Sequence, residues 1–315
     1  MNNPFQHWYD QCNTGTNADK YAALPDFPNH IDVELTSTCN YRCLMCPTGN
    51  LSLERPGMFM AWETFEKIVA ECEPHGTGIR FIGWGEPMLH PQFYRFLRHA
   101  ADALLPTHLS TNGSKMTEND QKMILGMGLD SIKFSFQGTS RESYAEMRGI
   151  DRYEALFSVI RTLYRRRDQA TRPFISVSTT VTDEHPSTIE VFKKKFEPYC
   201  DQLSIGHTTF DYMDPDAAVN PNRVREMAAK QTVTANHPRP CPEVYDKLSI
   251  HADGSAHICC NDFNGSTLLG NINETDMESI WTHAVIERYR EMLAGNEYNG
   301  PLCSNCYDYM ELTNG

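Results

Sequence analysis

The sequence lacks the features of a membrane or exported protein. No stretch of its 315 residues approaches the roughly 20 consecutive apolar residues that a transmembrane helix needs. The opening segment, Met1 to Asp10, has neither the basic flank nor the apolar core of a signal peptide. We therefore expect a cytoplasmic protein that does not enter the membrane.

An excess of basic residues is also absent. The formal net charge is −13, whereas a nucleic-acid groove needs clustered Lys and Arg to neutralise phosphates. The basic runs Arg165–Arg167 and Lys193–Lys195 fall in helical stretches, where we expect them to form solvated faces. No internal repeat or low-complexity tract is visible. These absences argue against a nucleic-acid partner and against a repeat architecture.

Short β-rich runs alternate with helical stretches, a pattern that predicts repeated βα units and a parallel sheet. The expected strands are Ile31–Leu35, Ile79–Ile82, Thr107–Ser110, Ser131–Phe136, Phe174–Val181 and Gln202–Gly206. The expected helices lie near residues 62–73, 90–104, 117–127, 151–167 and 187–196. The fold class that follows is α/β, a partial (β/α)6 TIM-like barrel with a small C-terminal β-hairpin and helix module. We expect an N-terminal extension at 1–29, the barrel at 30–212, and a linker and module at 213–315.

Polar and cysteine-containing motifs follow the first four expected strands. They are Cys39–Cys46, Gly83–Pro87, Ser110–Gly113 and Ser135–Gly138. In such barrels the functional groups collect at the carboxyl ends of the strands. We therefore expect these motifs to share one mouth of the barrel.

Cys39, Cys43 and Cys46 have the spacing C-x3-C-x2-C. A structural zinc site normally has four ligands, commonly in two C-x2-C pairs, so three close thiolates make a poor zinc site. Three thiolates can instead hold three irons of a four-iron cluster, whose usual complement is four cysteines. The fourth iron is then open to a small ligand.

The cysteine loop after the first strand, Gly85-Glu86-Pro87 after the second, and the partial barrel resemble the radical S-adenosylmethionine (radical SAM) superfamily over about residues 30–210. The resemblance implies a 4Fe–4S cluster whose open iron is chelated by SAM, and a 5′-deoxyadenosyl radical that removes a hydrogen atom from the substrate. Two positions depart from the family pattern. Met45 stands where an aromatic residue is common, and Trp84 replaces the first glycine of G-G-E-P.

The resemblance also implies the residues that contact SAM. They are Gly85, Glu86, Pro87, Asn112, Ser135, Gln137 and Arg148. Gly85 and Glu86 are expected to hold the amino group of SAM, and Arg148 to pair with its carboxylate. Asn112 and either Ser135 or Gln137 are expected near the ribose and carboxylate. Each of these polar residues taken singly also fits a strand-end turn or a helix cap.

A second cysteine group lies in the last quarter of the chain. Its predicted ligands are Cys241, Cys259, Cys303 and Cys306. The element Cys-x12-Gly-x4-Cys followed by Cys-x2-Cys resembles the shortened auxiliary-cluster module called twitch, which is related to the SPASM module. The resemblance implies a second 4Fe–4S cluster. Four thiolates also suit tetrahedral zinc, so a structural zinc site is the alternative.

Cys260 adjoins a predicted ligand, and the spacing favours Cys259 over Cys260 as that ligand. Cys260 is then free either to donate a hydrogen atom to a substrate radical or to pack as a small apolar residue. We expect Cys12, Cys72 and Cys200 to be packing residues.

The layout resembles sugar- and aminocyclitol-modifying dehydrogenases and epimerases. That resemblance implies a small polar substrate, a radical at a hydroxyl-bearing carbon, and a flavodoxin or ferredoxin as reductant. Peptide maturation is the alternative enzyme class, disfavoured because only about 30 residues precede the first strand, too few for an independent leader-binding domain. A metal-stabilised binding protein is the alternative outside the enzymes. Substrate contacts are expected from the strand ends and from His207–Asp214, which includes Asp211 and Tyr212.

Overall fold

The computed structural model describes residues 2–167, 172–210, 215–217, 220–235, 240–304, 306 and 310–314. Asp211 and Tyr212, both expected near the substrate, lie outside the described residues.

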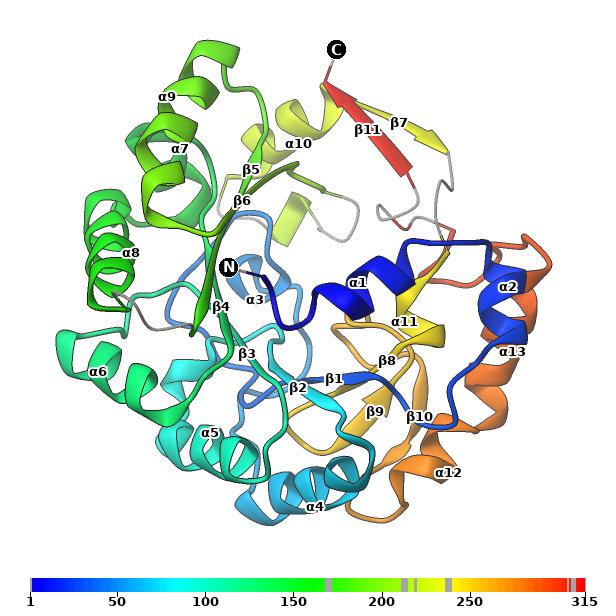
Figure 1. Cartoon of the computed structure of the whole chain (residues 1–315). Coiled ribbons are helices and arrows are strands. Elements are labelled where there is room, and N and C mark those ends of the chain that lie inside the picture. The colour runs from blue at the N-terminus through cyan, green and yellow to red at the C-terminus, as the bar shows by residue number, and fades with distance from the viewer. Residues whose placement is uncertain are drawn as a thin grey trace.

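One nine-stranded sheet curls around the centre of the molecule (Figure 1). Its order is β10-β9-β8-β1-β2-β3-β4-β5-β6. The bounds are β1 His30–Val33, β2 Gly78–Phe81, β3 Thr107–Thr111, β4 Ser131–Ser135, β5 Phe174–Val181, β6 Gln202–His207, β8 Lys247–Ile250, β9 Ser255–His257 and β10 Leu268–Asn271. Strands β8 and β1 to β6 are parallel, whereas β9 and β10 are antiparallel to their neighbours. The predicted parallel barrel with a small C-terminal hairpin is confirmed.

The sequence did not predict that β8 joins the barrel. It pairs in parallel with β1, with His30 opposite Lys247 and Val33 opposite Ile250. Strands β8 and β9 form an antiparallel hairpin of the kind expected in the C-terminal module. The C-terminal module is therefore continuous with the barrel sheet through backbone hydrogen bonds. A separate two-stranded sheet pairs β7 (Gln231–Ala235) with β11 (Met310–Asn314).

The barrel strands alternate in polarity with a period of two. Ile31, Val33, Phe134 and other apolar side chains are buried against the surrounding helices. Successive side chains of a strand point to opposite faces, so the intervening residues face the lumen. These are mostly polar, namely His30, Asp32, Arg80, His108, Ser110, Ser131, Lys133, Ser176, Ser178, Ser204, Lys247 and Ser249. The lumen is thus polar, unlike the branched apolar interior of a closed TIM barrel.

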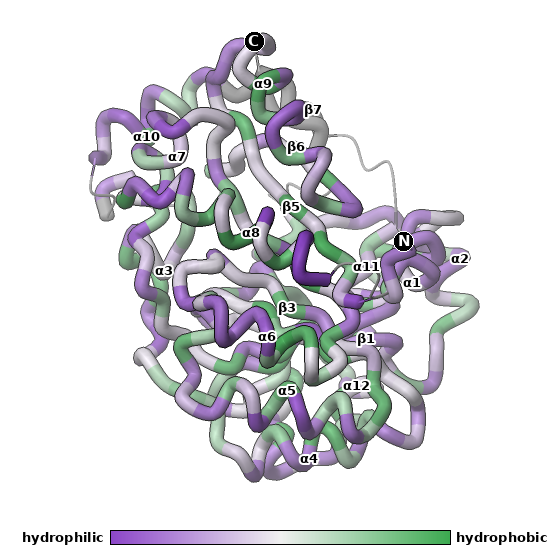
Figure 2. The backbone as a smooth tube through the Cα atoms, turned by 60° about the vertical axis from the view of Figure 1, so that its left-hand side comes forward, coloured by the Kyte–Doolittle hydropathy of each residue, from purple (hydrophilic) through white to green (hydrophobic). Residues whose placement is uncertain are grey.

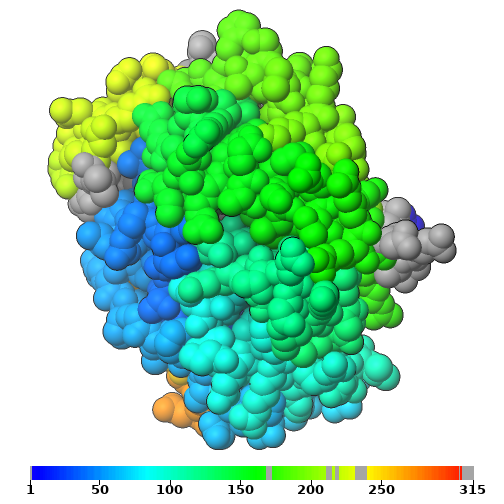
Figure 3. All heavy atoms as spheres, turned by 90° about the vertical axis from the view of Figure 1, so that its left-hand side faces the viewer, coloured from blue at the N-terminus to red at the C-terminus, as the bar shows by residue number. Residues whose placement is uncertain are grey.

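The expected outer helices are α4 (Trp62–Cys72), α5 (Phe93–Asp102), α6 (Glu118–Met127), α8 (Tyr153–Arg167) and α9 (Pro186–Phe196). Figure 2 shows hydrophilic and hydrophobic residues alternating along helices such as α4 and α5, as expected of helices with one face on the core. Figure 3 shows the cyan to green segments as a continuous cover on this side of the molecule. Arg167 is an exception to the expected solvated face, because it is buried and paired with Asp201.

Helix α7 (Arg141–Arg148) was not expected. Ser140 caps it in a reciprocal capping box with Ser143, and Gly149 ends it at φ +70°. These two signals are short and local, which explains why the hydrophobic pattern alone missed an eight-residue helix. The helix delivers Arg148 to the barrel mouth.

The N-terminal segment packs against the strand starts. Phe5 precedes α1 (Gln6–Cys12), is fully buried, and contacts the rings of His30 and His108 edge-on. A Cβ atom on Gly78 would lie 2.8 Å from both Phe5 and Trp8. This segment therefore closes the end of the barrel opposite the predicted mouth. Among the helices that are described, none is long and apolar enough to cross a bilayer.

Candidate cluster, cofactor and substrate sites

The loop carrying Cys39, Cys43 and Cys46 is held by backbone contacts. The amide of Leu44 donates to the carbonyl of Met147 at the end of α7 (2.7 Å), and that of Cys46 donates to the carbonyl of Cys43 (3.2 Å). Helix α3 (Pro47–Asn50) starts directly after Cys46, and a Cβ atom on Gly49 would lie 2.2 Å from the carbonyl oxygen of Cys43. Only glycine permits this close approach. The loop therefore has one compact arrangement.

The structure brings the first three predicted cluster ligands together. Burial raises the pKa of the Cys39 thiol to about 12, and the charges of Cys43, Glu86 and Cys46 add to the shift. Burial and the Cys43 charge likewise raise the pKa of Cys46. A metal or cluster requires deprotonated thiols, so loading this site releases protons.

Hydrogen-bond donors face these sulfurs. Arg148 Nη1 lies 3.2 Å from the Cys43 sulfur, and Asn112 Nδ2 lies 3.9 Å from the Cys39 sulfur. The amide of Tyr41 lies 3.5 Å from the Cys39 sulfur. Donors and a buried guanidinium stabilise an anionic thiolate–iron cluster, so the residues present fit such a group. Asn112 also lines a cavity of about 190 Å³ beside the cysteine loop.

The Gly85-Glu86-Pro87 element joins three strand ends. A Cβ atom on Gly85 would lie 1.9 Å from the carbonyl oxygen of Thr36, so the loops after β1 and β2 touch backbone to backbone. The Glu86 carboxylate accepts hydrogen bonds from the Thr111 hydroxyl and the Asn112 amide, both at 2.7 Å. Glu86 is buried, and burial raises its pKa. The Glu86 carboxylate therefore connects the loop after β2 to the end of β3 by hydrogen bonds, in addition to any role toward SAM.

The other predicted SAM contacts are divided between two places. Arg148 also donates to the backbone carbonyl of Ser135, so both residues lie at the cysteine loop. Gln137 donates instead to the hydroxyls of Thr180 and, at 2.8 Å, Thr208 on the β5–β6 side. Contact of these residues with SAM stays a prediction.

Two of the predicted auxiliary ligands, Cys241 and Cys259, lie beside α11 (Pro242–Tyr245). Cys241 precedes this helix, and ligand atoms of Glu243, Cys259 and Cys260 lie within 4.8 Å of one another. The neighbouring Cys260 thiol, burial and the Glu243 charge raise the pKa of Cys259.

Tyr298 and Tyr289 are each close enough to feel the charge of Cys303 and that of one other predicted auxiliary ligand. Burial raises the pKa of Tyr298, and the charges of Cys241 and Cys303 add to that shift. Burial likewise raises the pKa of Tyr289, with contributions from Cys303 and Cys259 among others. The Cys306 amide donates to the Cys303 carbonyl (3.3 Å).

A cavity of about 220 Å³, lined by both apolar and polar residues, lies between the barrel and this module. Asp32, Glu34, Trp84, His251 and Cys260 are among its lining residues. Cys260 therefore borders open space, whereas Cys72 lies in the apolar core and Cys200 packs against it, as expected of packing residues.

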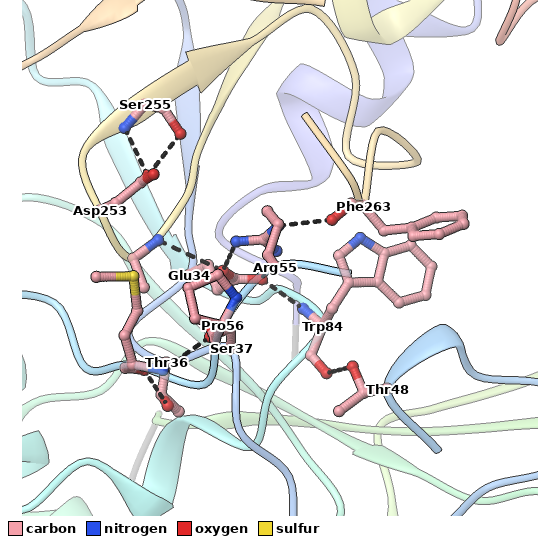
Figure 4. Close-up of polar contacts among 12 residues, drawn as sticks. Glu34, Thr36, Ser37, Thr48, Arg55, Pro56, Trp84, Asp253, Ser255 and Phe263 are labelled. Carbon is pink, nitrogen blue, oxygen red and sulfur yellow. Dashed lines mark hydrogen bonds and ion pairs between the residues drawn. The ribbon is translucent and has the colours of Figure 1, made fainter. Parts of the chain in front are cut away.

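Figure 4 shows the polar contacts of Glu34, one of the residues that line this cavity. Its carboxylate accepts hydrogen bonds from both terminal nitrogens of Arg55 (2.9 and 3.0 Å) and from the backbone amide of Trp84 (3.0 Å). Arg55 Nε donates to the carbonyl of Phe263 at 2.6 Å. The indole of Trp84 donates to the carbonyl of Cys260 at 2.9 Å. These contacts hold the C-terminal module against the barrel. No sequence pattern indicated that residues as distant as Glu34 and Phe263 both contact Arg55.

Comparison with protein families agrees with this geometry. The model of the radical SAM superfamily matches residues 33–192, and that of the SPASM iron–sulfur cluster-binding domain matches residues 241–307. The chain belongs to the radical SAM superfamily. More narrowly, it is a radical SAM protein with a SPASM-type module, and its cofactors are SAM and iron–sulfur clusters of the 4Fe–4S kind.

The curated relatives are distant and longer. An AdoMet-dependent heme synthase of Methanosarcina barkeri is 27% identical over 176 residues, covering 56% of this chain and 48% of the relative. A tungsten-containing aldehyde ferredoxin oxidoreductase cofactor-modifying protein of Pyrococcus furiosus is 29% identical over 160 residues, covering 50% and 44%. The chain thus spans about half the length of these relatives.

Solved structures share the fold. BtrN in complex with AdoMet and 2-DOIA is 16% identical with a TM-score of 0.57, covering 90% of this chain and 98% of that one. SuiB of Streptococcus suis bound to S-adenosylmethionine is 15% identical with a TM-score of 0.68, covering 93% and 74%. At this identity the likeness concerns the fold alone.

Proposed function

We propose that this protein cleaves SAM reductively and removes a hydrogen atom from a carbinol carbon of a small polar substrate, of the sugar, aminoglycoside or aminocyclitol kind. The observation that carries the proposal is the presence of Asp32, Glu34, His251 and Cys260 in the lining of one cavity beside the barrel mouth. Carboxylate and imidazole groups can orient substrate hydroxyls by hydrogen bonds. BtrN, whose structure contains AdoMet and 2-DOIA, supports a small-molecule substrate through its similar fold.

In this proposal Cys39, Cys43 and Cys46 hold the catalytic cluster, and Cys241, Cys259, Cys303 and Cys306 hold the auxiliary one. A cluster held by Cys39, Cys43 and Cys46 would supply, once reduced, the electron for cleavage of SAM to methionine and a 5′-deoxyadenosyl radical. Gly85, Glu86, Asn112 and Arg148 orient SAM at the strand ends. The division of the chain at residues 30 and 212 is part of the same proposal.

The iron content tests this assignment. Anaerobically reconstituted protein should hold about eight irons per chain, the sum of two four-iron clusters. Replacing Cys241 and Cys303 together with Ala should halve the iron and leave SAM cleavage by dithionite detectable. Zinc in place of half the iron would contradict the auxiliary cluster.

Two outcomes are open to the substrate radical. Loss of a proton and one electron gives a ketone, with the auxiliary cluster as electron acceptor. Alternatively, the Cys260 thiol gives a hydrogen atom to the opposite face and yields an epimer, and the resulting sulfur radical regains one electron and one proton from a flavodoxin or ferredoxin and solvent. The position of Cys260 at the cavity supports the second outcome.

Turnover in deuterated water separates the two outcomes. An epimerase should place one solvent deuterium on the substrate carbon, and Cys260→Ala should abolish the epimer while 5′-deoxyadenosine still forms. Cys200→Ala is the control, since Cys200 packs against the core and is not among the residues that line the cavity. Ketone formation without deuterium, unchanged in Cys260→Ala, would exclude the donor role.

Peptide maturation is the second candidate, because SuiB has also been solved with its precursor peptide SuiA and covers 92% of this chain with a TM-score of 0.67. A screen for substrate-dependent 5′-deoxyadenosine formation with sugars, aminocyclitols and peptides distinguishes the candidates. Stimulation by peptides alone would overturn the sugar assignment.

A further inference from the structure

The barrel lumen contains a cavity that the proposed chemistry does not use. Its volume is about 290 Å³, and its lining includes Arg80, Lys133, Ser131, Ser176, Ser178 and Ser204. These residues come from β2, β4, β5 and β6. Asn3 and Tyr9 of the N-terminal segment line its other end. That segment packs against the strand starts, at the end of the barrel opposite the predicted mouth.

The charges around the cavity do not balance. Asp32 lies 3.2 Å from Arg80 and 3.6 Å from Lys247, and Lys247 also pairs with Glu243. Burial and the nearby Arg80 charge hold the pKa of His30 and His108 well below the usual range, so both rings are neutral. Two carboxylates thus face the cations Arg80, Lys247 and Lys133. One positive charge is left over.

That charge belongs to Lys133. Among the described residues its amine makes no ion pair or hydrogen bond, although the side chain is largely enclosed. Burial and the Arg80 charge lower its pKa to about 8, so it stays mostly protonated near neutral pH. Hydroxyl groups of serines from three strands border the same cavity. A cation ringed by hydroxyl donors is suited to an anion.

We propose that Lys133 and the serines around it form a subsite for a carboxylate or phosphate group of the substrate. This inference rests on the proposed function and narrows its substrate class to acidic small molecules. Lys133 lies two residues before Ser135 on β4, so the subsite is about 6 to 7 Å deeper than the mouth. A sugar acid or sugar phosphate bound there directs its ring carbons toward the mouth, where SAM is expected.

Calorimetric titration of the reconstituted protein tests the subsite without SAM or reductant. The probes are glucose 6-phosphate, glucuronate, inorganic phosphate and glucose at constant ionic strength. At least one anion should bind, glucose should bind at least about tenfold more weakly, and the tighter of the two sugar anions identifies the group. Lys133→Met should lose at least about tenfold in anion affinity, as removal of a charged hydrogen bond implies.

Two further variants serve as controls for the effect of Lys133→Met. Lys133→Arg should retain most of the affinity, because it keeps the charge. Lys122→Met removes an exposed lysine from α6 and should change nothing. Equal anion binding by wild type and Lys133→Met, or no anion binding by wild type, overturns the subsite. If the protein binds no anion but turns over a neutral sugar, the anion subsite is wrong and the proposed function still holds.

Discussion

Single residues fix the barrel mouth, and Gly85 is the clearest case. Gly85→Ala would place a methyl carbon 1.9 Å from the Thr36 carbonyl oxygen and 2.6 Å from that of Thr38. Both are backbone atoms, so the loops after β1 and β2 must separate. We expect a loss of about 3 kcal/mol in unfolding free energy and loss of SAM cleavage. Urea unfolding and 5′-deoxyadenosine assays measure these effects.

Gly126→Ala is the matched control. Gly126 lies within α6 with no atom within 4 Å of an added Cβ. Alanine there should stabilise the protein by about 0.5–1 kcal/mol, because it restricts the unfolded chain and favours a helix. Equal stability losses in both variants would contradict the steric argument.

The residue scale also shows how far sequence reasoning reaches. Spacing alone indicated that Cys39, Cys43 and Cys46 act together, since ligands within eight residues need little knowledge of the fold. Spacing could not show that Arg148 donates to the Cys43 sulfur, because that contact depends on where α7 ends. For the same reason, spacing could not show that Gln137 and Glu86 form hydrogen bonds between neighbouring strand ends.

At the scale of elements, the ion pair of Glu34 and Arg55 joins the barrel to the C-terminal module. Their side chains are only 2% and 12% exposed. Arg55→Met leaves a buried carboxylate without its partner, and we expect a loss of about 3 kcal/mol. Hydrogen exchange should rise first around Ala252 and Phe263, whose backbone groups contact this pair.

The double variant Glu34→Gln with Arg55→Met removes the unpaired charge and should recover part of the loss. Arg98→Met breaks an exposed pair with Asp102 and should cost less than about 1 kcal/mol. Similar losses of unfolding free energy in Arg55→Met and Arg98→Met would contradict a stabilising role of the Glu34–Arg55 pair.

The elements themselves were largely predictable. The six barrel strands follow from β-rich runs, and their ends agree with the structure to within about two residues because turns and caps mark them. The parallel pairing of β8 with β1 was not predictable. A four-residue strand carries no signal of its partner, and a hairpin motif suggests only local pairing.

For the whole molecule, buried neutral histidines predict sensitivity to acid. Burial and the His257 ring lower the pKa of His251 to about 3. In the unfolded chain the His251 imidazole is protonated near pH 6.5, whereas in the folded protein it is protonated only near pH 3. His251 therefore favours the folded state only above pH 6.5, and this contribution is lost progressively as the pH falls toward 3.

Between pH 7 and 5 the loss from His251 should be about 2 kcal/mol. Anaerobic urea unfolding at both pH values measures it, and His251→Gln should reduce the pH dependence by that amount. His7→Gln, which alters an exposed ring, should leave it unchanged. An unaltered dependence in His251→Gln would show that the imidazole is accessible to protons when folded.

The parallel pairing of β1 with β8 has a consequence for biosynthesis. His30 emerges early from the ribosome, whereas its neighbour Lys247 is made only in the last quarter of the chain. Until then one edge of the nascent barrel is a bare strand that can pair with other chains. Chains that stall before β8 should therefore aggregate, and chaperones that shield this edge should raise the yield of full-length protein.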